Sequence, residues 1–332
     1  MHAERRYVGT LWAEAQQIAV CNTELKPGTV SNYRIYFRKH VTPEIGAVKI
    51  NAVSSADVVK LHGKIGFAKP VTANRVVEAI SSLYRYAATI GVVEKGFNPT
   101  TGITAFREVR RERFLTTDEL QRLGATLREA ETVGLPWNTD ETKSRGKHLP
   151  KPAKRLVIFS PYVTAAIRLL LFTGCRLREI LHLRWNEIDF EREIFFLPDS
   201  KTGTRAVILN APALTVLNEI KRIGTYVILG ERSDRPRSDL NRPWVRITVH
   251  AKLEGLRIHD LRHSFASIGA GGGLGLPIVG KLLGHTTAAS TARYAHIDND
   301  PLKRASERIG HTIQAALGES LIQEADVIRL RK

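Results

Sequence analysis

The chain has 332 residues, of which 43% are hydrophobic and 25% charged, a composition typical of globular proteins that are long enough for two domains. Fifty Lys and Arg residues against 33 Asp and Glu give a formal net charge of +17. Residues 1–110 hold 15 basic and 8 acidic side chains, which leaves 35 and 25 for the rest. A surplus shared by both halves argues against a basic tail. It favours a polyanion such as nucleic acid as partner, although a merely soluble cationic protein has the same balance.

Cysteine content and hydropathy limit the compartment. Cys21 and Cys175 are too few and too far apart for a disulfide framework or a thiolate metal site. No apolar signal core follows Met1, and no apolar run reaches transmembrane length. These features predict a cytoplasmic protein without a membrane partner.

The first hundred residues show helical spacing of apolar side chains. We predict helices at 11–20, 30–40, 56–65 and 71–90. The last of these has the clearest stripe, which comprises Val76, Val77, Ile80, Leu83, Tyr84 and Ala87. Gly91 and then Asn98-Pro99 end the bundle. We therefore assign residues 1–99 to a helical domain and residues 100–113 to a linker.

The second half mixes helices with a few short strands. Thr116 or Thr117 can cap one helix, and Ser160-Pro161 begins another that ends at Thr173-Gly174. Between them lies a long basic loop, 131–155, which is either a solvated excursion or a DNA contact. Three strands are predicted at 187–190, 193–197 and 205–209, with helices from there to about 317. The fold class is thus mainly α with a small antiparallel β-sheet (α+β), with a second domain at 114–318 and a tail at 319–332.

Four patches of the second domain carry side chains suited to phosphate chemistry. Thr173-Gly-Cys-Arg-Leu-Arg-Glu places Arg176 at the head of a helix, where free amides and a guanidinium can hold a phosphate. Lys201 lies at the tip of the predicted hairpin. His259-Asp-Leu-Arg-His puts His259 and Arg262 on one helical face. Leu283-Gly-His is followed nine residues after His285 by Tyr294.

Each of these residues alone has an ordinary structural explanation. A single Arg, Lys or His is usually solvated or structural, and a single Tyr is usually part of a core. Glu179 is expected to support its arginine neighbours, and Cys175 to pack inside the protein because no base pairs with it. His263 and His296 receive no role, since surface or hydrogen-bonding positions suffice for them.

The order of the whole set, Thr-Gly-x-Arg-x-x-Glu, Lys, His-x-x-Arg-His, Leu-Gly-His and Arg-Tyr, closely resembles the tyrosine recombinase (phage integrase) family. The resemblance runs from about residue 70 to 300. It implies the catalytic residues Arg176, Lys201, His259, Arg262, His285 and Tyr294. Thr72-Ala-Asn-Arg75 and Asn98-Pro99 resemble the helical core-binding domain of the family more weakly, and we expect Asn74, Arg75 and Arg85 to bind DNA.

These residues account for transfer of a DNA phosphoryl group to a phenol without a metal or other cofactor. Two guanidiniums, Arg176 and Arg262, can clamp the non-bridging oxygens, and His285 can add a hydrogen bond. Tyr294 is the nucleophile, His259 the candidate base and Lys201 the candidate acid for the 5′-oxygen. The expected product is a 3′-phosphotyrosyl DNA, as in integration or excision of a mobile element.

The resemblance also implies partners. These are double-stranded DNA, a homodimer on each site and a homotetramer in synapsis, and it leaves room for accessory DNA-bending or directionality proteins. The tail from Glu319 is expected to dock on its own domain or on a neighbouring protomer. The chain starts almost at the core-binding helices, so it is either a two-domain recombinase or a truncated one. Two alternatives remain open: a type IB topoisomerase and a non-catalytic DNA-binding regulator.

Overall fold

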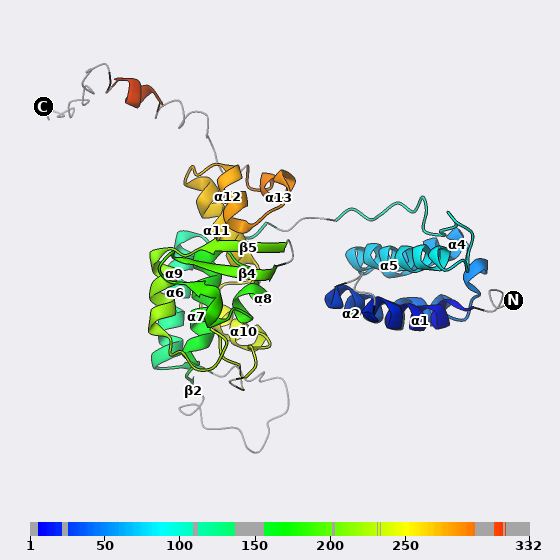
Figure 1. The fold of residues 1–332 in the computed structure, drawn as a ribbon, viewed down its shortest axis with the longest axis horizontal. Helices are drawn as coiled ribbons and strands as arrows, with labels where there is room; N and C mark the ends of the chain where they lie inside the picture. Colours follow the sequence, from blue (N-terminus) through cyan, green and yellow to red (C-terminus); the bar gives the residue numbers. More distant parts are fainter. Residues whose placement is uncertain are drawn as a thin grey trace, which may run out of the picture. The chain divides into compact units, whose positions relative to one another are not determined.

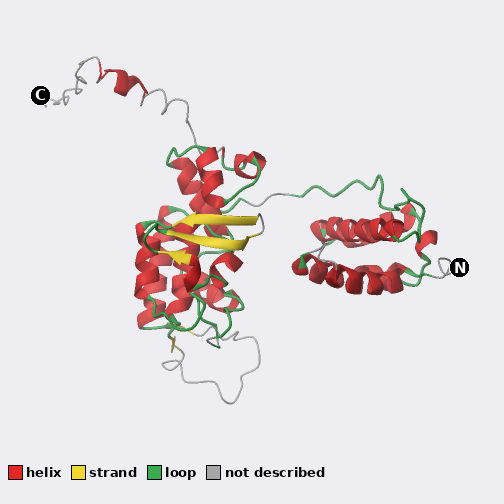
Figure 2. Cartoon of the chain, in the orientation of Figure 1, coloured by secondary structure: helices red, strands yellow, loops and turns green. Residues whose placement is uncertain are grey.

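A computed structural model describes residues 6–21, 26–108, 112–136, 156–200, 203–230, 232, 234–295, 309–314 and 316. The chain divides into two compact units, Met1–Arg111 and Glu112–Lys332 (Figures 1 and 2). No helix within these described ranges is both long and apolar enough to cross a membrane.

Unit 1 is helical, as predicted. Its elements are α1 (Val8–Cys21), α2 (Pro27–Tyr36), the π-helical turn η2 (Phe37–Val41), α3 (Thr42–Ile45), the 3₁₀ turn η3 (Ile50–Ala52), α4 (Ser55–Gly66) and α5 (Pro70–Thr89). Helix α5 packs on α1, α2 and α4 (Figure 1). The predicted stripe of α5 faces this core: Val76, Ile80 and Tyr84 are fully buried. The Tyr84 hydroxyl donates a 2.8 Å hydrogen bond to the carbonyl of Ile50, which satisfies its polar atom inside the core.

The segment after the bundle is tied to unit 1 by Asn74, which is 6% exposed. Its Oδ1 accepts a 2.9 Å bond from the backbone N–H of Phe106, and its Nδ2 donates to the Phe106 carbonyl at 2.9 Å and to Glu108 at 3.0 Å. The Phe106 ring lies on that of His62, 4.3 Å between centroids. Residues 106–108 were expected in a linker; in the structure this part of the segment packs on the helical unit.

Unit 2 combines helices with short antiparallel strands. The elements are α6 (Thr117–Thr132), β1 (Leu135–Pro136), β2 (Leu156–Val157), α7 (Pro161–Thr173), α8 (Leu177–Leu181), η5 (Trp185–Glu187), β3 (Ile188–Asp189), β4 (Ile194–Ser200), β5 (Gly203–Ile208), α9 (Ala211–Glu219), α10 (Asn241–His250), α11 (Asp260–Gly271), α12 (Leu276–Leu283) and α13 (Ala288–Ala292). The three predicted strands are confirmed as β3, β4 and β5. The β1–β2 pair was not predicted. Helices were expected throughout 220–240, but the described residues of this stretch are mostly turns and loops.

The three-stranded sheet, of order β3-β4-β5, is buried on one face only. Phe195 pairs with Val207, and both side chains face the core of unit 2. The neighbouring Phe196 and Ile208 point the other way and are exposed. The strands lie against the helices of unit 2 (Figure 2), so the sheet holds the β4–β5 hairpin beside the helices of that unit.

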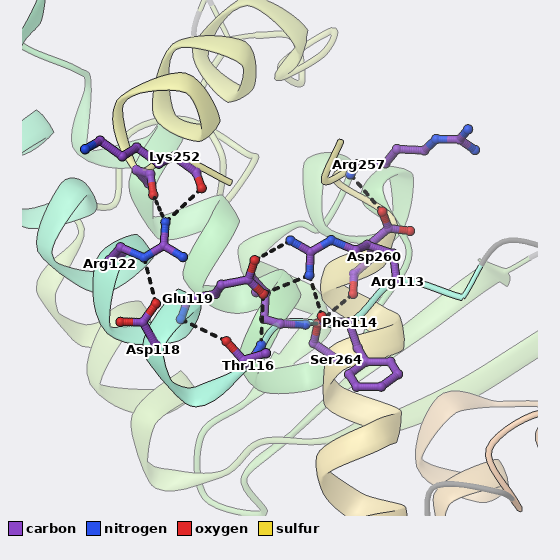
Figure 3. A network of polar contacts seen from close by, with 12 residues as sticks. Arg113, Phe114, Thr116, Asp118, Glu119, Arg122, Lys252, Arg257, Asp260 and Ser264 are labelled. Carbon is purple, nitrogen blue, oxygen red and sulfur yellow. Dashed lines mark hydrogen bonds and ion pairs between the residues drawn. The ribbon is translucent and has the colours of Figure 1, made fainter. Parts of the chain in front are cut away.

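A polar network fixes the start of unit 2 against α11 (Figure 3). Thr116 and Glu119 form a capping box at α6, and Arg113 pairs with the same Glu119 carboxylate at 2.8 Å. The backbone N–H of Leu115 donates a 2.8 Å bond to the Ser264 hydroxyl on α11. The segment leading into unit 2 is thereby attached to the helix that bears His259 and Arg262.

We predict that Glu119→Gln lowers the free energy of unfolding by about 1–2 kcal/mol at neutral pH. The Arg113 guanidinium, with the backbone of Thr116, holds the pKa of Glu119 at about 2, below its ordinary value near 4.5. A depressed pKa stabilises the fold above pH 4.5 and loses that effect as the pH falls toward 2. In denaturant unfolding between pH 7 and pH 3, the difference in free energy of unfolding between wild type and Glu119→Gln should therefore become smaller below pH 4.5. Asp118→Asn, in an exposed pair with Arg122, is the control with little effect; a difference independent of pH would contradict the assignment.

Candidate active site

Arg176 is the N-cap residue of α8, immediately after the turn that ends α7. Gly174 makes this turn possible, because its φ is +63° and a Cβ there would lie 2.5 Å from the Phe265 ring. Glu179, 9% exposed, accepts bonds from the backbone N–H of Arg176 at 2.8 Å and from its Nη1 at 2.7 Å. Burial raises the pKa of Glu179, but these donors and Arg205 outweigh it, so the carboxyl is ionised and orients Arg176.

Arg262 joins three of the motifs. It lies on α11, is 4% exposed, and donates from Nη1 to the Gly174 carbonyl and from Nη2 to the Leu283 carbonyl, both at 2.7 Å. One carbonyl precedes Arg176 in the chain and the other precedes His285. Burial, then Arg176 and Arg205, lower the pKa of Arg262 to about 10, which still leaves it charged at neutral pH. Arg262 therefore positions the other motifs as well as supplying charge.

His285 follows Gly284, the left-handed C-cap of α12. Its Nδ1 lies 2.8 Å from the hydroxyl of Thr291, which is buried on α13, and its backbone N–H donates to the Gly280 carbonyl. Burial is the largest cause that lowers the pKa of His285 to about 4, followed by Arg262, Arg176, Arg205 and Arg293. His285 is thus neutral near pH 7 and is surrounded by guanidiniums.

Tyr294 is 4% exposed and packs in a small core with Ala266, Ala270, Val279 and Leu283. Its hydroxyl lies 2.6 Å from Nδ1 of His263, the residue after Arg262. The Arg293 guanidinium is 5.9 Å from the centre of the phenol ring. Burial raises the pKa of Tyr294, while Arg293 and Arg262 act in the opposite direction. The phenol is accordingly protonated in this structure.

His259, the N-cap of α11, lines an open cleft of about 660 Å³ together with Arg176. Further basic side chains of the cleft are Arg178, His182 and Arg184, and Glu179 and Glu187 are its acidic ones. The His259 ring meets that of His263 edge-on, with centroids 5.1 Å apart. The surrounding protein and Arg262 lower the pKa of His259. This cleft is lined by enough cations to receive a phosphodiester beside Arg176.

Arg205 belongs to the same cluster and was not foreseen. From β5 its Nη2 reaches Glu179 at 3.2 Å and the Cys175 sulfur at 3.4 Å, and its Nη1 reaches the Leu282 carbonyl at 3.4 Å. A signal was present in the sequence: Arg205 alternates with Val207 and Leu209 on the buried face of a strand, where an apolar residue is the rule. His263 was also left without a role, although it lies one helical turn after His259.

The remaining expectations have mixed outcomes. Cys175 is 1% exposed and burial raises its pKa to about 11, so the packing role expected for it is confirmed. Glu179 pairs with Arg176 and Arg205, while Arg178 lies 3.3 Å from His182. Lys201 and His296 lie outside the described residues; strands β4 and β5, which flank Lys201, are paired up to Ser200 and Gly203. The structure thus brings together Arg176, His259, Arg262, His285 and Tyr294, whose catalytic roles stay predictions.

In unit 1 the predicted DNA contacts separate into two kinds. The buried amide of Asn74 bonds to His62, Phe106 and Glu108, an internal role that was not expected, and its role as a DNA contact stays a prediction. Arg75 pairs with Glu108 and Glu78 at the surface of α5. Arg85 is exposed and, with Tyr33, Ser81 and Thr100, lines a shallow open groove. Arg75 and Arg85 stay predictions as DNA contacts.

Comparison with known sequences supports this assembly of motifs. The profile described as the Phage integrase family matches residues 151–300. The integrase of Salmonella phage P22 is 28% identical over 179 residues, which cover 48% of this chain and 46% of that protein. The shufflon-specific DNA recombinase of Escherichia coli is 26% identical, covering 82% and 62%. The chain therefore spans less than two thirds of each of these relatives. The tyrosine recombinase XerA of Thermococcus onnurineus (strain NA1) is 24% identical over 90% of this chain and 93% of its own.

Solved structures give the same fold. The Tn1549 transposon integrase in complex with a circular intermediate DNA has a TM-score of 0.66 at 15% identity, covering 92% of this chain and 100% of that one. A lambda integrase dimer bound to a COC′ core site has a TM-score of 0.63 at 17% identity, covering 88% and 78%. Residues 151–300, which contain all the ordered motifs, thus match the Phage integrase family, and the chain shares the fold of these solved integrases.

Proposed function

We propose that this chain is a site-specific DNA recombinase that cuts and rejoins duplex DNA through a 3′-phosphotyrosyl bond made by Tyr294. The observation that carries the proposal is the convergence of four motif segments on one phenol. Arg262 binds the carbonyls of Gly174 and Leu283, and the next residue, His263, contacts the Tyr294 hydroxyl. Segments up to about 120 residues apart in the sequence thus meet around the Tyr294 phenol.

The charges of the site suit a phosphodiester passing through a pentacoordinate state. Arg176 and Arg262 would hold the non-bridging oxygens, on which negative charge accumulates. His285, neutral and fixed by Thr291, would donate a hydrogen bond from its other ring nitrogen. Lys201 is proposed as the acid that protonates the departing 5′-oxygen. Because the bond energy is kept in the phosphotyrosine, rejoining needs no nucleotide.

The proposed partners are duplex DNA and further copies of this chain. The lambda integrase has been solved as a dimer bound to a core site and as a tetramer bound to a Holliday junction, the latter with a TM-score of 0.60 to this chain. By this likeness we infer a dimer on each site and a tetramer in synapsis. Integration or excision of a mobile element is the biological role that we propose.

A nicked suicide substrate tests the chemistry. We expect the wild-type protein to form a denaturation-resistant adduct with the 3′ side of the cut. The adduct should form equally in excess EDTA, because the charge of the transferring phosphate is met by guanidiniums. Loss of the adduct on chelation, restored by Mg²⁺, would overturn the mechanism. Relaxation of plasmids at sites unrelated to the recombination site, with no strand exchange, would instead favour a type IB topoisomerase activity.

A further inference from the structure

The hydroxyl of Tyr294 is in contact with one histidine, and it is not the one expected as base. Nδ1 of His263 lies 2.6 Å from this hydroxyl. His259, the sequence-based candidate, meets the side of the His263 ring instead and lines the cleft with Arg176. The two histidines of the His-x-x-Arg-His motif thus face different parts of the site: His259 faces the cleft that would hold the phosphate, and His263 faces the nucleophile.

We propose that His263 is the immediate proton acceptor of Tyr294 in DNA cleavage and its donor in rejoining, while His259 serves the phosphate. This inference rests on the proposed function. In cleavage the O–H bond of Tyr294 breaks and its proton forms an N–H bond at Nδ1 of His263. The phenolic oxygen then bonds to phosphorus, and the 5′-oxygen leaves with a proton from the acid of the site. In rejoining, the 5′-hydroxyl gives its proton back to the acid of the site and its oxygen bonds to phosphorus. The phenolic oxygen is displaced and recovers its proton from His263.

The contact geometry fits proton transfer. A separation of 2.6 Å is short for a hydrogen bond between a hydroxyl and a ring nitrogen, and the phenol is shielded from water by the small core around it. A neutral imidazole has one acceptor nitrogen, so Nδ1 accepts from the phenol when the proton of the ring is on Nε2. Because Tyr294 is only 4% exposed, bulk solvent is a slower proton acceptor for its hydroxyl than His263.

The charges around His263 explain why the proton of Tyr294 is not transferred in the absence of DNA. Burial is the largest cause that lowers the pKa of His263 to about 4, followed by Arg293 and His259; Asp260 acts in the opposite direction, and Arg262 adds a smaller lowering effect. Of the helices packed on α11, α7 carries Arg168, which pairs with Glu131, and α12 carries Lys281, which is exposed. The free protein therefore keeps the proton on the phenol.

An incoming phosphate changes this balance. Its negative charge offsets the positive charges of Arg262 and Arg293, which disfavour protonation of His263. The pKa of His263 therefore rises when the substrate is bound. Without DNA this negative charge is missing, and the pKa of His263 stays low. His263 is thereby a base that the substrate itself activates, and the buried phenol stays unreactive toward other electrophiles until then.

Two substitutions separate proton transfer from mere positioning. His263→Asn places an amide near the Nδ1 position and keeps a hydrogen-bond partner for the phenol, but the amide cannot take a proton. His263→Gln places its amide nearer the Nε2 position, so the phenol loses both its hydrogen-bond partner and its proton acceptor. A DNA substrate with a bridging 5′-sulfur is used, because sulfur leaves without a proton and the measured rate then reports activation of the nucleophile.

The experiment is single-turnover adduct formation from pH 6 to pH 9, with melting temperature and DNA binding measured for each variant. We expect His263→Asn to be about 10²–10³-fold slower than wild type at pH 7 and to gain about tenfold per pH unit, since the phenol must ionise to solvent. If the Asn variant unfolds, His263→Gln should show the same steep profile. A rate within about threefold of wild type, a profile parallel to wild type, or a steep profile in His259→Asn alone would overturn the proposal. A wild-type protein that forms no adduct would instead overturn the proposed function.

Discussion

Tyr294→Phe is expected to abolish covalent attachment to DNA, with adduct formation falling below detection on suicide substrates. The substitution removes one oxygen, and that oxygen is the atom that would bond to phosphorus. The ring would keep its place in the core with Leu283 and Val279, since Phe has nearly the same shape. Only the hydrogen bond to His263 is lost, so the free energy of unfolding should change by about 1 kcal/mol.

DNA binding and a second tyrosine provide the controls. The Phe variant should bind its site within about threefold of wild type, because the phenol is buried and uncharged. Tyr226 also lines the cleft beside Arg176 and His259, which makes it the competing phenol. Tyr226→Phe should still form an adduct, and peptide mapping of the wild-type adduct should find Tyr294. An adduct mapped to Tyr226 would show that the wrong phenol had been assigned.

Arg262→Lys is expected to reduce adduct formation by about 10²–10³-fold and also to destabilise unit 2. Lysine keeps the positive charge, but one ammonium cannot reach the carbonyls of Gly174 and Leu283 together while contacting a phosphate. A buried carbonyl left without a donor costs about 1–3 kcal/mol. The loss of activity should persist at saturating DNA, since the phosphate clamp acts during the reaction.

Arg176→Lys is the matched control for this prediction. Its side chain is 23% exposed, and it bonds to Glu179 and to no carbonyl that holds another motif in place. We expect a comparable loss of activity with less than about 1 kcal/mol of lost stability. Denaturant unfolding and single-turnover cleavage of both variants would test the contrast. Equal stability of the two variants would mean that Arg262 does not hold the motifs together.

Much of the fold follows from local patterns in the sequence. The stripe of α5 and the strands β4 and β5 were predictable because burial of one face imposes a period on side chains. The turn at Gly174 was predictable because few other residues can end a helix in the left-handed region. The β1–β2 pair could not be foreseen, since two-residue strands carry no periodicity and their partners are about twenty residues apart. The irregular 220–240 stretch contains apolar residues that pack without a helix.

The sequence led to residues that the fold brings together, but it did not predict the contacts between them. Motif order led to Arg176, Arg262, His285 and Tyr294, but order says nothing about which side chain touches which. The bond between His263 and Tyr294 joins residues 31 positions apart and depends on how α11 and the chain after α13 pack. Asn74 shows the same limit: the sequence suggested a DNA contact, and only the fold reveals that its amide bonds to Phe106 and Glu108.

Two constraints favour glycine at position 284 of Leu283-Gly-His, and they come from different parts of the chain. One is local: its φ is +66°. The other comes from β5, since a Cβ at Gly284 would lie 2.2 Å from Nη1 of Arg205. Asparagine, which tolerates the left-handed region, would satisfy the first requirement and still collide with the guanidinium. The side chain at position 205 therefore limits the size of the side chain that position 284 can carry, although the two positions lie 79 residues apart in the sequence.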